Sequence, residues 1–204
     1  MKNKKNKEMD VIFLLDRSGS MSGMEEDTIG GYNSYLAKLK NNGYNTKITT
    51  ILFDDQYEVL RMREDIQKIA KITNKEYFCR GCTALYDAIG KTINTFKNNV
   101  NNKVNNKVLF IITTDGLENA SREYDRASVI KMIQEHTNWE FMYIGANIDS
   151  YDEGQSIGIK RNNIANYKKT SVGTKELFDA VFDATSCVYD RGEVGTSWKD
   201  KLSD

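Results

Sequence analysis

The chain has 204 residues, with 29 lysines and arginines balanced by 29 aspartates and glutamates. This length suits one domain with a full α/β core, and the balanced charge gives no overall attraction to nucleic acid or to an anionic membrane. No stretch approaches the ~20 apolar residues of a membrane span, and the apolar run at 11–15 is too short for a signal-peptide core, so we expect a cytoplasmic protein. Residues 1–8, with basic residues from 2 to 7, are expected to form a disordered, solvated tail.

The first predicted element is a strand at about residues 10–16. Its five apolar residues, Val11–Leu15, show no polar alternation, which is typical of a strand buried on both faces of a parallel sheet. Asp16, Ser18 and Ser20 follow in the loop that leaves the strand, and in open α/β sheets this edge carries the ligand. Carboxylate and hydroxyl oxygens are hard donors of the kind that Mg²⁺ and Mn²⁺ prefer, which indicates a metal site. The simpler alternative is a turn and N-cap that opens the first helix.

Helical and strand patterns then alternate through the first half of the chain. Apolar residues at helical spacing predict a helix from about 24 to 41. The β-branched run Thr46–Phe53 predicts a second strand, and a tight turn then leads into an antiparallel edge strand at 57–62. A short helix is expected over 64–72.

The same alternation continues through the second half. Its clearest features are a helix from Thr83 or Ala84 to about residue 98 and a central strand at Val108–Thr113. The remaining expected elements are a helix at 122–137, a strand at 140–144, a short helix at 151–158, a weak strand at 163–168 and a helix at 174–189. We assign residues 9–190 to the domain and 191–204 to a C-terminal tail whose last ten or so residues are held loosely.

The alternation of strands and helices predicts βαβ units and a mostly parallel sheet. Right-handed crossovers bring the carboxyl ends of the strands before Asp16 and Asp115 to the same edge of that sheet. If the chain reverses direction after the second strand, these two strands are neighbours at the switch point. Two carboxylates far apart in the sequence then share one site.

Three motifs together resemble the von Willebrand factor type A family. The first is Asp-x-Ser-x-Ser at 16–20 after a buried strand, which resembles the metal-ion-dependent adhesion site (MIDAS) of the family. The family also uses a Thr from a second loop and an Asp from a third. Thr83 in Gly81-Cys-Thr-Ala-Leu85 and Asp115 in Ile111-Ile-Thr-Thr-Asp-Gly116 match them in order and spacing.

The resemblance extends from about residue 9 to about 190 and implies a fold and a cation. The fold is a Rossmann-like, doubly wound, mostly parallel six-stranded α/β sheet of order 3-2-1-4-5-6, with strand 3 antiparallel at the edge and helices on both faces. The implied cation is Mg²⁺ or Mn²⁺, with Ca²⁺ as a further candidate. In the family the hydroxyls bind the metal directly, while the acids often act through bound water. The implied direct ligands are Ser18, Ser20 and Thr83, and the implied charged partners are Asp16 and Asp115.

The resemblance also implies a function without enzyme activity. The chain resembles the small free-standing bacterial and phage members of the family. The family's metal site implies a protein-binding module, in which an Asp or Glu from a partner protein completes the coordination of the metal. Some intracellular relatives act with AAA+ ATPases and some near stress-resistance systems, and this sequence does not select among them. Neither nucleic acid nor a membrane is expected as a partner. Movement of the last helix on partner binding is an analogy with some relatives.

Several other polar residues are candidates for the rim of the site. Glu118, Asn119 and Ser121 resemble a stretch found in small family members, as does the segment 145–149. Turn chemistry explains both stretches about as well. Asp54 and Asp55 are better explained by a hairpin turn.

The cysteines give a weaker signal. Cys79 and Cys82 have the spacing of half a zinc site or of a redox pair, and Cys82 stands where the family often has a second glycine. Only Cys187 and the single histidine, His136, remain as further ligands, whereas a structural zinc site normally needs four. Reduced thiols without a role are therefore the default interpretation.

Two other functions remain open. A Mg²⁺-dependent phosphotransferase of the haloacid dehalogenase type also places an Asp after its first strand, but it usually has a second Asp two residues later, where this chain has Ser18. We find no nucleophile–base arrangement and no phosphate-binding glycine loop, so no enzyme activity is expected. The other function is that of a structural interaction domain without metal.

Overall fold

The computed structural model describes residues 8–97, 107–146 and 148–202, so nearly all of the predicted N-terminal tail lies outside it. The strands are β1 (Met9–Asp16), β2 (Thr46–Phe53), β3 (Tyr57–Asp65), β4 (Lys107–Thr114), β5 (Trp139–Gly145) and β6 (Ile164–Asn166). The α-helices of the described residues are α1 (Glu25–Asn42), α2 (Leu85–Lys97), α3 (Arg126–Glu135), α4 (Ser150–Ser156) and α5 (Ser171–Arg191). None of these helices is long and apolar enough to span a bilayer.

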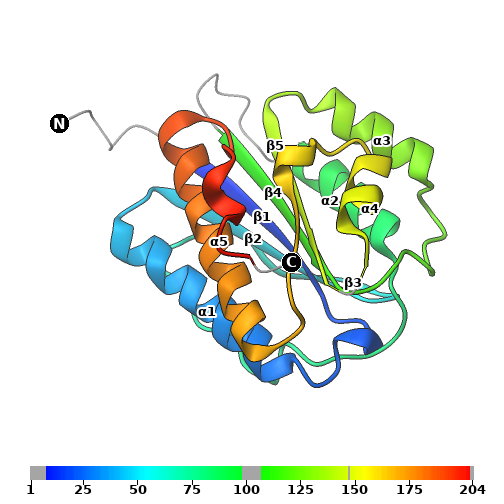
Figure 1. Ribbon diagram of the computed structural model, residues 1–204, viewed down its shortest axis with the longest axis horizontal. Helices are drawn as coiled ribbons and strands as arrows, with labels where there is room; N and C mark the ends of the chain where they lie inside the picture. Colours follow the sequence, from blue (N-terminus) through cyan, green and yellow to red (C-terminus); the bar gives the residue numbers. More distant parts are fainter. Residues whose placement is uncertain (1–7, 98–106, 147, 203–204) are drawn as a thin grey trace.

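The strands form one sheet with helices on both faces (Figure 1). Helices α1 and α5 pack together on one face, and α2, α3 and α4 lie on the other. Side chains of β1 alternate between the two layers: Phe13 and Leu15 join the α1/α5 side, whereas Ile12 and Leu14 join the opposite side. All four are at most 1% exposed, which explains why the apolar run of β1 has no polar gap.

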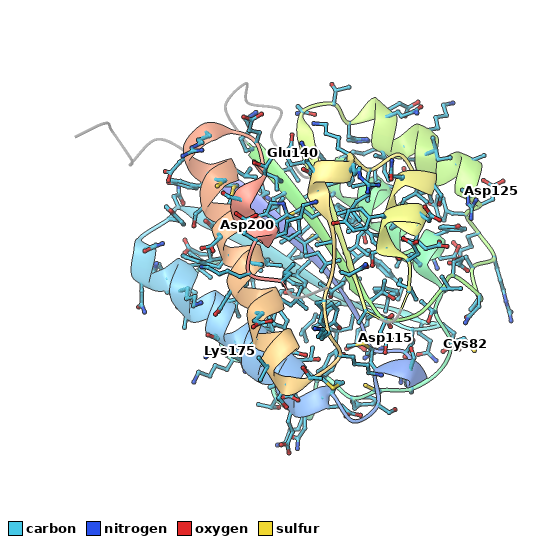
Figure 2. The ribbon with its side chains drawn as sticks, viewed as in Figure 1. Cys82, Asp115, Asp125, Glu140, Lys175 and Asp200 are labelled. Atoms are coloured by element: carbon cyan, nitrogen blue, oxygen red, sulfur yellow. The ribbon has the colours of Figure 1, made fainter. Side chains whose placement is uncertain are left out.

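The sheet has the predicted order β3-β2-β1-β4-β5-β6, with β3 antiparallel to β2 and the other pairs parallel. Strand β1 therefore lies between β2 and β4, where the strand order reverses. The carboxyl ends of β1 and β4 meet at one edge, as expected at a topological switch point. Figure 2 shows Asp115 at this edge and Glu140, near the start of β5, at the opposite end of the sheet.

The prediction of a short helix at 64–72 was wrong. Strand β3 takes the first residues of this segment, and turns and extended chain follow. Ile66, Ile69 and Ile72, which have helical spacing, are all buried in the core against α1 without forming a helix. The side chain of Asn33 in α1 holds the end of this segment. It donates a hydrogen bond to the carbonyl oxygen of Ile72 and accepts one from the N–H of Ile72, both at 2.9 Å.

The end of the chain also differs from the expectation that the last ten or so residues of the tail at 191–204 are held loosely. Helix α5 stops at Gly192, whose φ of 93° forms a left-handed cap. Beyond it, Val194 and Trp198 are each only 1% exposed. The indole N–H of Trp198 donates to the carbonyl oxygen of Asn162 at 2.9 Å, so the chain end folds back to the segment just before β6.

Candidate metal centre

The loop after β1 is held by the carboxylate that begins it. Asp16 is fully buried at the last position of the strand. Its Oδ1 accepts a hydrogen bond from the N–H of Ser18 at 2.6 Å, and its Oδ2 accepts one from the Thr114 hydroxyl at 2.6 Å. The Tyr77 hydroxyl donates to the main-chain oxygen of Asp16, also at 2.6 Å. These contacts hold Asp16 between the loop that follows β1, the end of β4 and the segment that carries Tyr77.

The loop that carries Thr83 is docked on this first loop through the backbone. The N–H of Arg80 donates to the carbonyl oxygen of Arg17 at 2.8 Å, and the N–H of Gly19 donates to that of Gly81 at 3.0 Å. Gly81 has a φ of +67°, a conformation that favours glycine. Thr83 follows two residues later and is 2% exposed.

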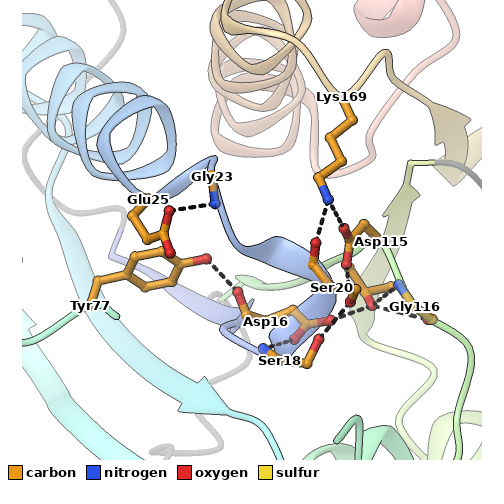
Figure 3. Close-up of polar contacts among 10 residues, drawn as sticks. Asp16, Ser18, Ser20, Gly23, Glu25, Tyr77, Asp115, Gly116 and Lys169 are labelled. Carbon is orange, nitrogen blue, oxygen red and sulfur yellow. Dashed lines mark hydrogen bonds and ion pairs between the residues drawn. The ribbon is translucent and has the colours of Figure 1, made fainter. Parts of the chain in front are cut away.

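The loop after β4 completes the cluster. Asp115 Oδ1 accepts a hydrogen bond from the Ser20 hydroxyl at 2.5 Å, and the hydroxyl oxygens of Ser18 and Ser20 are 2.9 Å apart (Figure 3). A Cβ at Gly116 would lie 2.9 Å from Thr83 Oγ1 and 3.3 Å from Ser20 Oγ. Hydroxyls from two loops therefore line one small space, which a side chain at position 116 would crowd.

The structure brings together all the residues predicted to form the site. They are Asp16, Ser18, Ser20, Thr83 and Asp115. Four further residues of the cluster were missed. Thr114 and Gly116 belong to the third motif. Strand alternation could have indicated Thr114, and the need for space beside the hydroxyls could have indicated Gly116. Tyr77 and Lys169 come from distant segments, and no local pattern in the sequence marks them.

Burial governs the charge of Asp16. Desolvation raises the pKa of its carboxyl group to about 6 from the ordinary 3.8, and hydrogen bonds from Thr114 and Ser18 offset only part of this effect. The negative charge of Asp115 is a smaller contribution to the same rise. Two carboxylates thus share a site in which the ionised form of at least one is costly without a nearby cation.

The neighbouring basic residues differ in where they point. Arg17 follows Asp16 in the sequence, but its guanidinium pairs with Asp54 at 3.3 Å and Glu58 at 2.8 Å. Lys169, from the loop before α5, reaches the cluster instead: its Nζ lies 2.7 Å from Asp115 Oδ2.

The donor set fits a hard divalent cation. It consists of hydroxyl and carboxylate oxygens without nitrogen or sulfur, whereas zinc sites usually contain histidine or cysteine. In the described parts of the chain, no group of three or more His, Cys, Asp or Glu residues is arranged to hold a metal. A metal ion in this cluster would therefore need the hydroxyls as ligands. The hydroxyls of Thr83 and Ser20 that face Gly116, next to two buried carboxylates, suit an ion such as Mg²⁺ that takes oxygen ligands and keeps some of its waters.

The rim residues Glu118, Asn119 and Ser121 hold loops together. Glu118 Oε2 accepts a hydrogen bond from the N–H of Tyr86 at 2.9 Å, and the Ser121 hydroxyl accepts one from the next N–H of α2 at 3.0 Å. Asn119 Oδ1 accepts one from the N–H of Thr83 at 2.9 Å. The loop after β4 therefore caps α2, which leaves the Thr83 hydroxyl free of that structural role.

The other rim candidates have local roles. Asp54 Oδ1 accepts a hydrogen bond from the N–H of Gln56 at 2.6 Å, which forms the predicted hairpin turn. Asp149, in the segment 145–149, caps α4 by accepting a hydrogen bond from the N–H of Asp152 at 3.1 Å. Residue 147 of that segment lies outside the described residues.

The cysteine thiols are all free. Cys79 is half-buried. Desolvation, and to a lesser extent the negative charge of Glu25, raises the pKa of its thiol to about 12. Cys82 is exposed on the same loop. His136 lies at the end of α3, where its ring centroid is 4.5 Å from that of Trp139, at the start of β5. It is therefore at the opposite end of the sheet from Asp115.

Residues 11–118, just over half of the chain, match the model of the von Willebrand factor type A domain. No curated protein matches the chain.

Three solved structures, of two proteins, illustrate the likeness in fold. Proximal thread matrix protein 1 (PTMP1) from the mussel byssus has a TM-score of 0.63 at 16% identity, covering 87% of this chain and 48% of that one. A second PTMP1 structure is described as having a zinc-occupied MIDAS motif. The von Willebrand factor type A protein from Catenulispora acidiphila has a TM-score of 0.63 at 16% identity, covering 88% of this chain and 42% of that one. The chain spans less than half the length of these structures.

Proposed function

The chain belongs to the von Willebrand factor type A domain family, and we propose that it acts as a protein-binding module that depends on a divalent metal ion. The proposed cation is Mg²⁺ or Mn²⁺, with Ca²⁺ as a further candidate. The observation that carries this proposal is the convergence of hydroxyls and carboxylates from three loops at the switch point of the sheet. The proposed direct ligands are Ser18, Ser20 and Thr83, with Asp16 and Asp115 as charged partners.

The proposed ligand set also favours a particular kind of partner. Both oxygens of Asp16 already accept hydrogen bonds, which suits a charge-balancing role rather than direct coordination. Hydroxyl ligands are neutral, so a bound cation keeps much of its positive charge and offers an open coordination position to a carboxylate. We therefore propose that an Asp or Glu of a partner protein fills that position.

Apolar side chains near the site support a protein as the partner. Phe78 is 41% exposed in the loop that leads to Thr83, and its ring centroid lies 5.5 Å from the Arg17 guanidinium. Leu117 is 52% exposed two residues after Asp115. Exposed apolar groups beside polar ones are typical of protein-binding surfaces. The family resemblance makes AAA+ ATPases and stress-resistance complexes the first partner classes to test.

The geometry gives less support to a phosphotransferase. The chain has Ser18 where such an enzyme needs a second carboxyl group, and the Ser18 hydroxyl lies 2.9 Å from that of Ser20. No general acid or base is available from this position. Hydrolysis of a generic phosphate ester that requires Mg²⁺ and is lost in Asp16→Asn would contradict the proposed function.

The experiment that tests the proposal measures metal binding directly. Isothermal titration calorimetry with MgCl₂ and MnCl₂, paired with thermal shift, would compare the wild type with a Ser18→Ala/Ser20→Ala double variant. Ser22→Ala is the matched control, because Ser22 lies in the same loop but is exposed. We expect about one ion per chain for the wild type and the control, and loss of binding in the double variant.

Two outcomes would overturn the proposal: a folded wild type that binds neither metal, or a double variant that binds as well as the wild type. If metal binds, capture of partners should be compared with Mg²⁺ and with chelator. The double variant then serves as the negative control. A partner retained equally under all three conditions would contradict the metal-dependent mode of binding.

A further inference from the structure

Lys169 lies in the loop between β6 and α5, 54 residues after Asp115 in the sequence, and its side chain extends into the candidate metal centre. Its Nζ lies 2.7 Å from Asp115 Oδ2 and also donates a hydrogen bond to the main-chain oxygen of Ser20 (Figure 3). The Lys169 side chain is 21% exposed, whereas that of Asp115 is 1% exposed. The ammonium group therefore lies at the outer side of an almost completely buried carboxylate.

The ion pair is part of the hydroxyl–carboxylate cluster. Asp115 uses its other oxygen, Oδ1, to accept the hydrogen bond from the Ser20 hydroxyl at 2.5 Å. Lys169 thus contacts both Asp115 and Ser20, two of the residues proposed to hold the cation. Without metal, this ammonium supplies positive charge to a buried acid that would otherwise be costly to ionise.

The backbone places Lys169 firmly at this position. Tyr167 donates its N–H to the carbonyl oxygen of Gly145 at 2.9 Å, which ties the loop to the end of β5. Thr170 is the N-cap of α5 and accepts a hydrogen bond from the N–H of Gly173 at 3.1 Å. Lys169 stands between these two anchors, so its side chain can withdraw through its own rotamers while the backbone stays in place.

We propose that Lys169 is a built-in competitor of the divalent cation. The inference rests on the proposed function: the ammonium balances Asp115 when metal is absent and must withdraw when metal binds. The physical reason is repulsion, because a monovalent and a divalent cation next to the same carboxylate, at a site shielded from water, repel each other strongly. Lys169 accordingly lowers the affinity for metal and keeps the metal-free site folded.

The test removes the charge and keeps the length of the side chain. Lys169→Met should tighten Mg²⁺ binding about tenfold or more in calorimetry. It should also lower the melting temperature of the metal-free protein and enlarge the stabilisation produced by Mg²⁺. Lys168→Met is the matched control, because Lys168 is the adjacent residue and is exposed. This control should leave all three quantities unchanged.

A second measurement uses the wild type and does not depend on any variant. Acylation of lysines by an amine-reactive reagent, followed by mass spectrometry, would compare Lys169 with Lys168 in the presence of chelator and of saturating MgCl₂. Lys169 should become several-fold more reactive with Mg²⁺, because its ammonium leaves Asp115, while Lys168 should not change.

The outcomes separate this inference from the proposed function. Equal Mg²⁺ affinity in the wild type and Lys169→Met, or weaker binding in the variant, would overturn the competition and leave the metal site intact. Absence of binding in both proteins would overturn the metal site and the competition with it. Binding in the variant but not in the wild type would support the competition and would contradict the metal-dependent function proposed for the wild type.

Discussion

Asp16 and Asp115 each accept a hydrogen bond from the chain segment that carries the other. Asp16 accepts a hydrogen bond at 2.6 Å from the hydroxyl of Thr114, the residue before Asp115. Asp115 accepts one at 2.5 Å from Ser20, in the loop that Asp16 begins. The two carboxylates therefore fix the relative position of the loops after β1 and β4, and a change of charge at one of them affects the whole site.

The first prediction concerns pH. The pKa of Asp16 is raised to about 6 by burial, so the folded protein holds this proton more tightly than the unfolded chain does. The stabilisation is fully present below about pH 4 and is lost as the pH rises through about 6. For the metal-free protein, ionisation of Asp16 should cost about 3 kcal/mol of unfolding free energy at neutral pH.

Asp16→Asn isolates this effect because its amide cannot ionise. Thr114 can accept a hydrogen bond from that amide, since its hydroxyl can donate to the carbonyl oxygen of Gly116 at 3.1 Å. In chelator, the variant should be more stable than the wild type near neutral pH, and the difference should shrink toward pH 4. Urea unfolding at several pH values measures this difference. A difference that does not depend on pH would contradict the prediction.

The second prediction concerns the space beside Gly116. A methyl group there would lie 2.9 Å from Thr83 Oγ1 and 3.3 Å from Ser20 Oγ. Because Mg²⁺ demands near-ideal octahedral geometry, Gly116→Ala should weaken Mg²⁺ binding about tenfold or more while the circular dichroism spectrum stays unchanged. Calorimetry measures the affinity, and Gly30→Ala, in open space on α1, is the control. An unchanged affinity would show that the ion does not use this space.

The third prediction concerns the support of the rim. Asp87 of α2 accepts hydrogen bonds from the backbone N–H groups of residues 122, 123 and 124 at 2.9–3.0 Å. Desolvation opposes ionisation of Asp87, but these hydrogen bonds outweigh it and lower the pKa of its carboxyl group. Asp87→Ala should cost about 2–3 kcal/mol at neutral pH, because three backbone N–H groups lose a charged acceptor.

This stabilisation by Asp87 should disappear at low pH. A lowered pKa means that the contribution is present above the ordinary value of 3.8 and is lost as the pH falls through the folded value. The difference between wild type and Asp87→Ala should therefore narrow in acid, as measured by urea unfolding. Asp125→Ala, which removes an exposed N-cap of α3, should cause a smaller loss. Equal losses would refute the role assigned to Asp87.

The fourth prediction compares adjacent glycines of α1. A Cβ at Gly31 would lie 2.1 Å from the ring of Phe178 in α5, which is itself buried. Gly31→Ala should therefore destabilise the protein by about 1–3 kcal/mol through overpacking. Gly30→Ala meets nothing within 4 Å and should stabilise it by about 0.5–1 kcal/mol through helix propensity. Chemical denaturation measures the change in unfolding free energy of both variants. A change of the same sign in both would disprove this packing of α1 against α5.

Much of the fold could be read from the sequence because its signals are local. The apolar runs in β1 and β4 have no alternating polar residues, as is typical of strands that are buried on both faces of a sheet. Their carboxyl ends carry Asp16 and Asp115, so the topology of a parallel sheet was enough to place both residues at one edge. The resemblance of three short motifs to the von Willebrand factor type A family added Thr83 to the site. The periodicity of the sequence alone does not connect Thr83 to the two carboxylates.

Other features were decided only by the tertiary structure. Residues 64–72 have helical apolar spacing but are held in another conformation by side chains of α1 such as Asn33. Trp198 became part of the core because the chain end folds back to Asn162, which accepts a hydrogen bond from its indole N–H.

Lys169 is the clearest case, since its contact with Asp115 depends on where the loop before α5 passes the end of β4. Local patterns record which face of an element is buried. Contacts between loops depend instead on the three-dimensional arrangement of the elements that carry them, and no neighbouring residues in the sequence encode that arrangement.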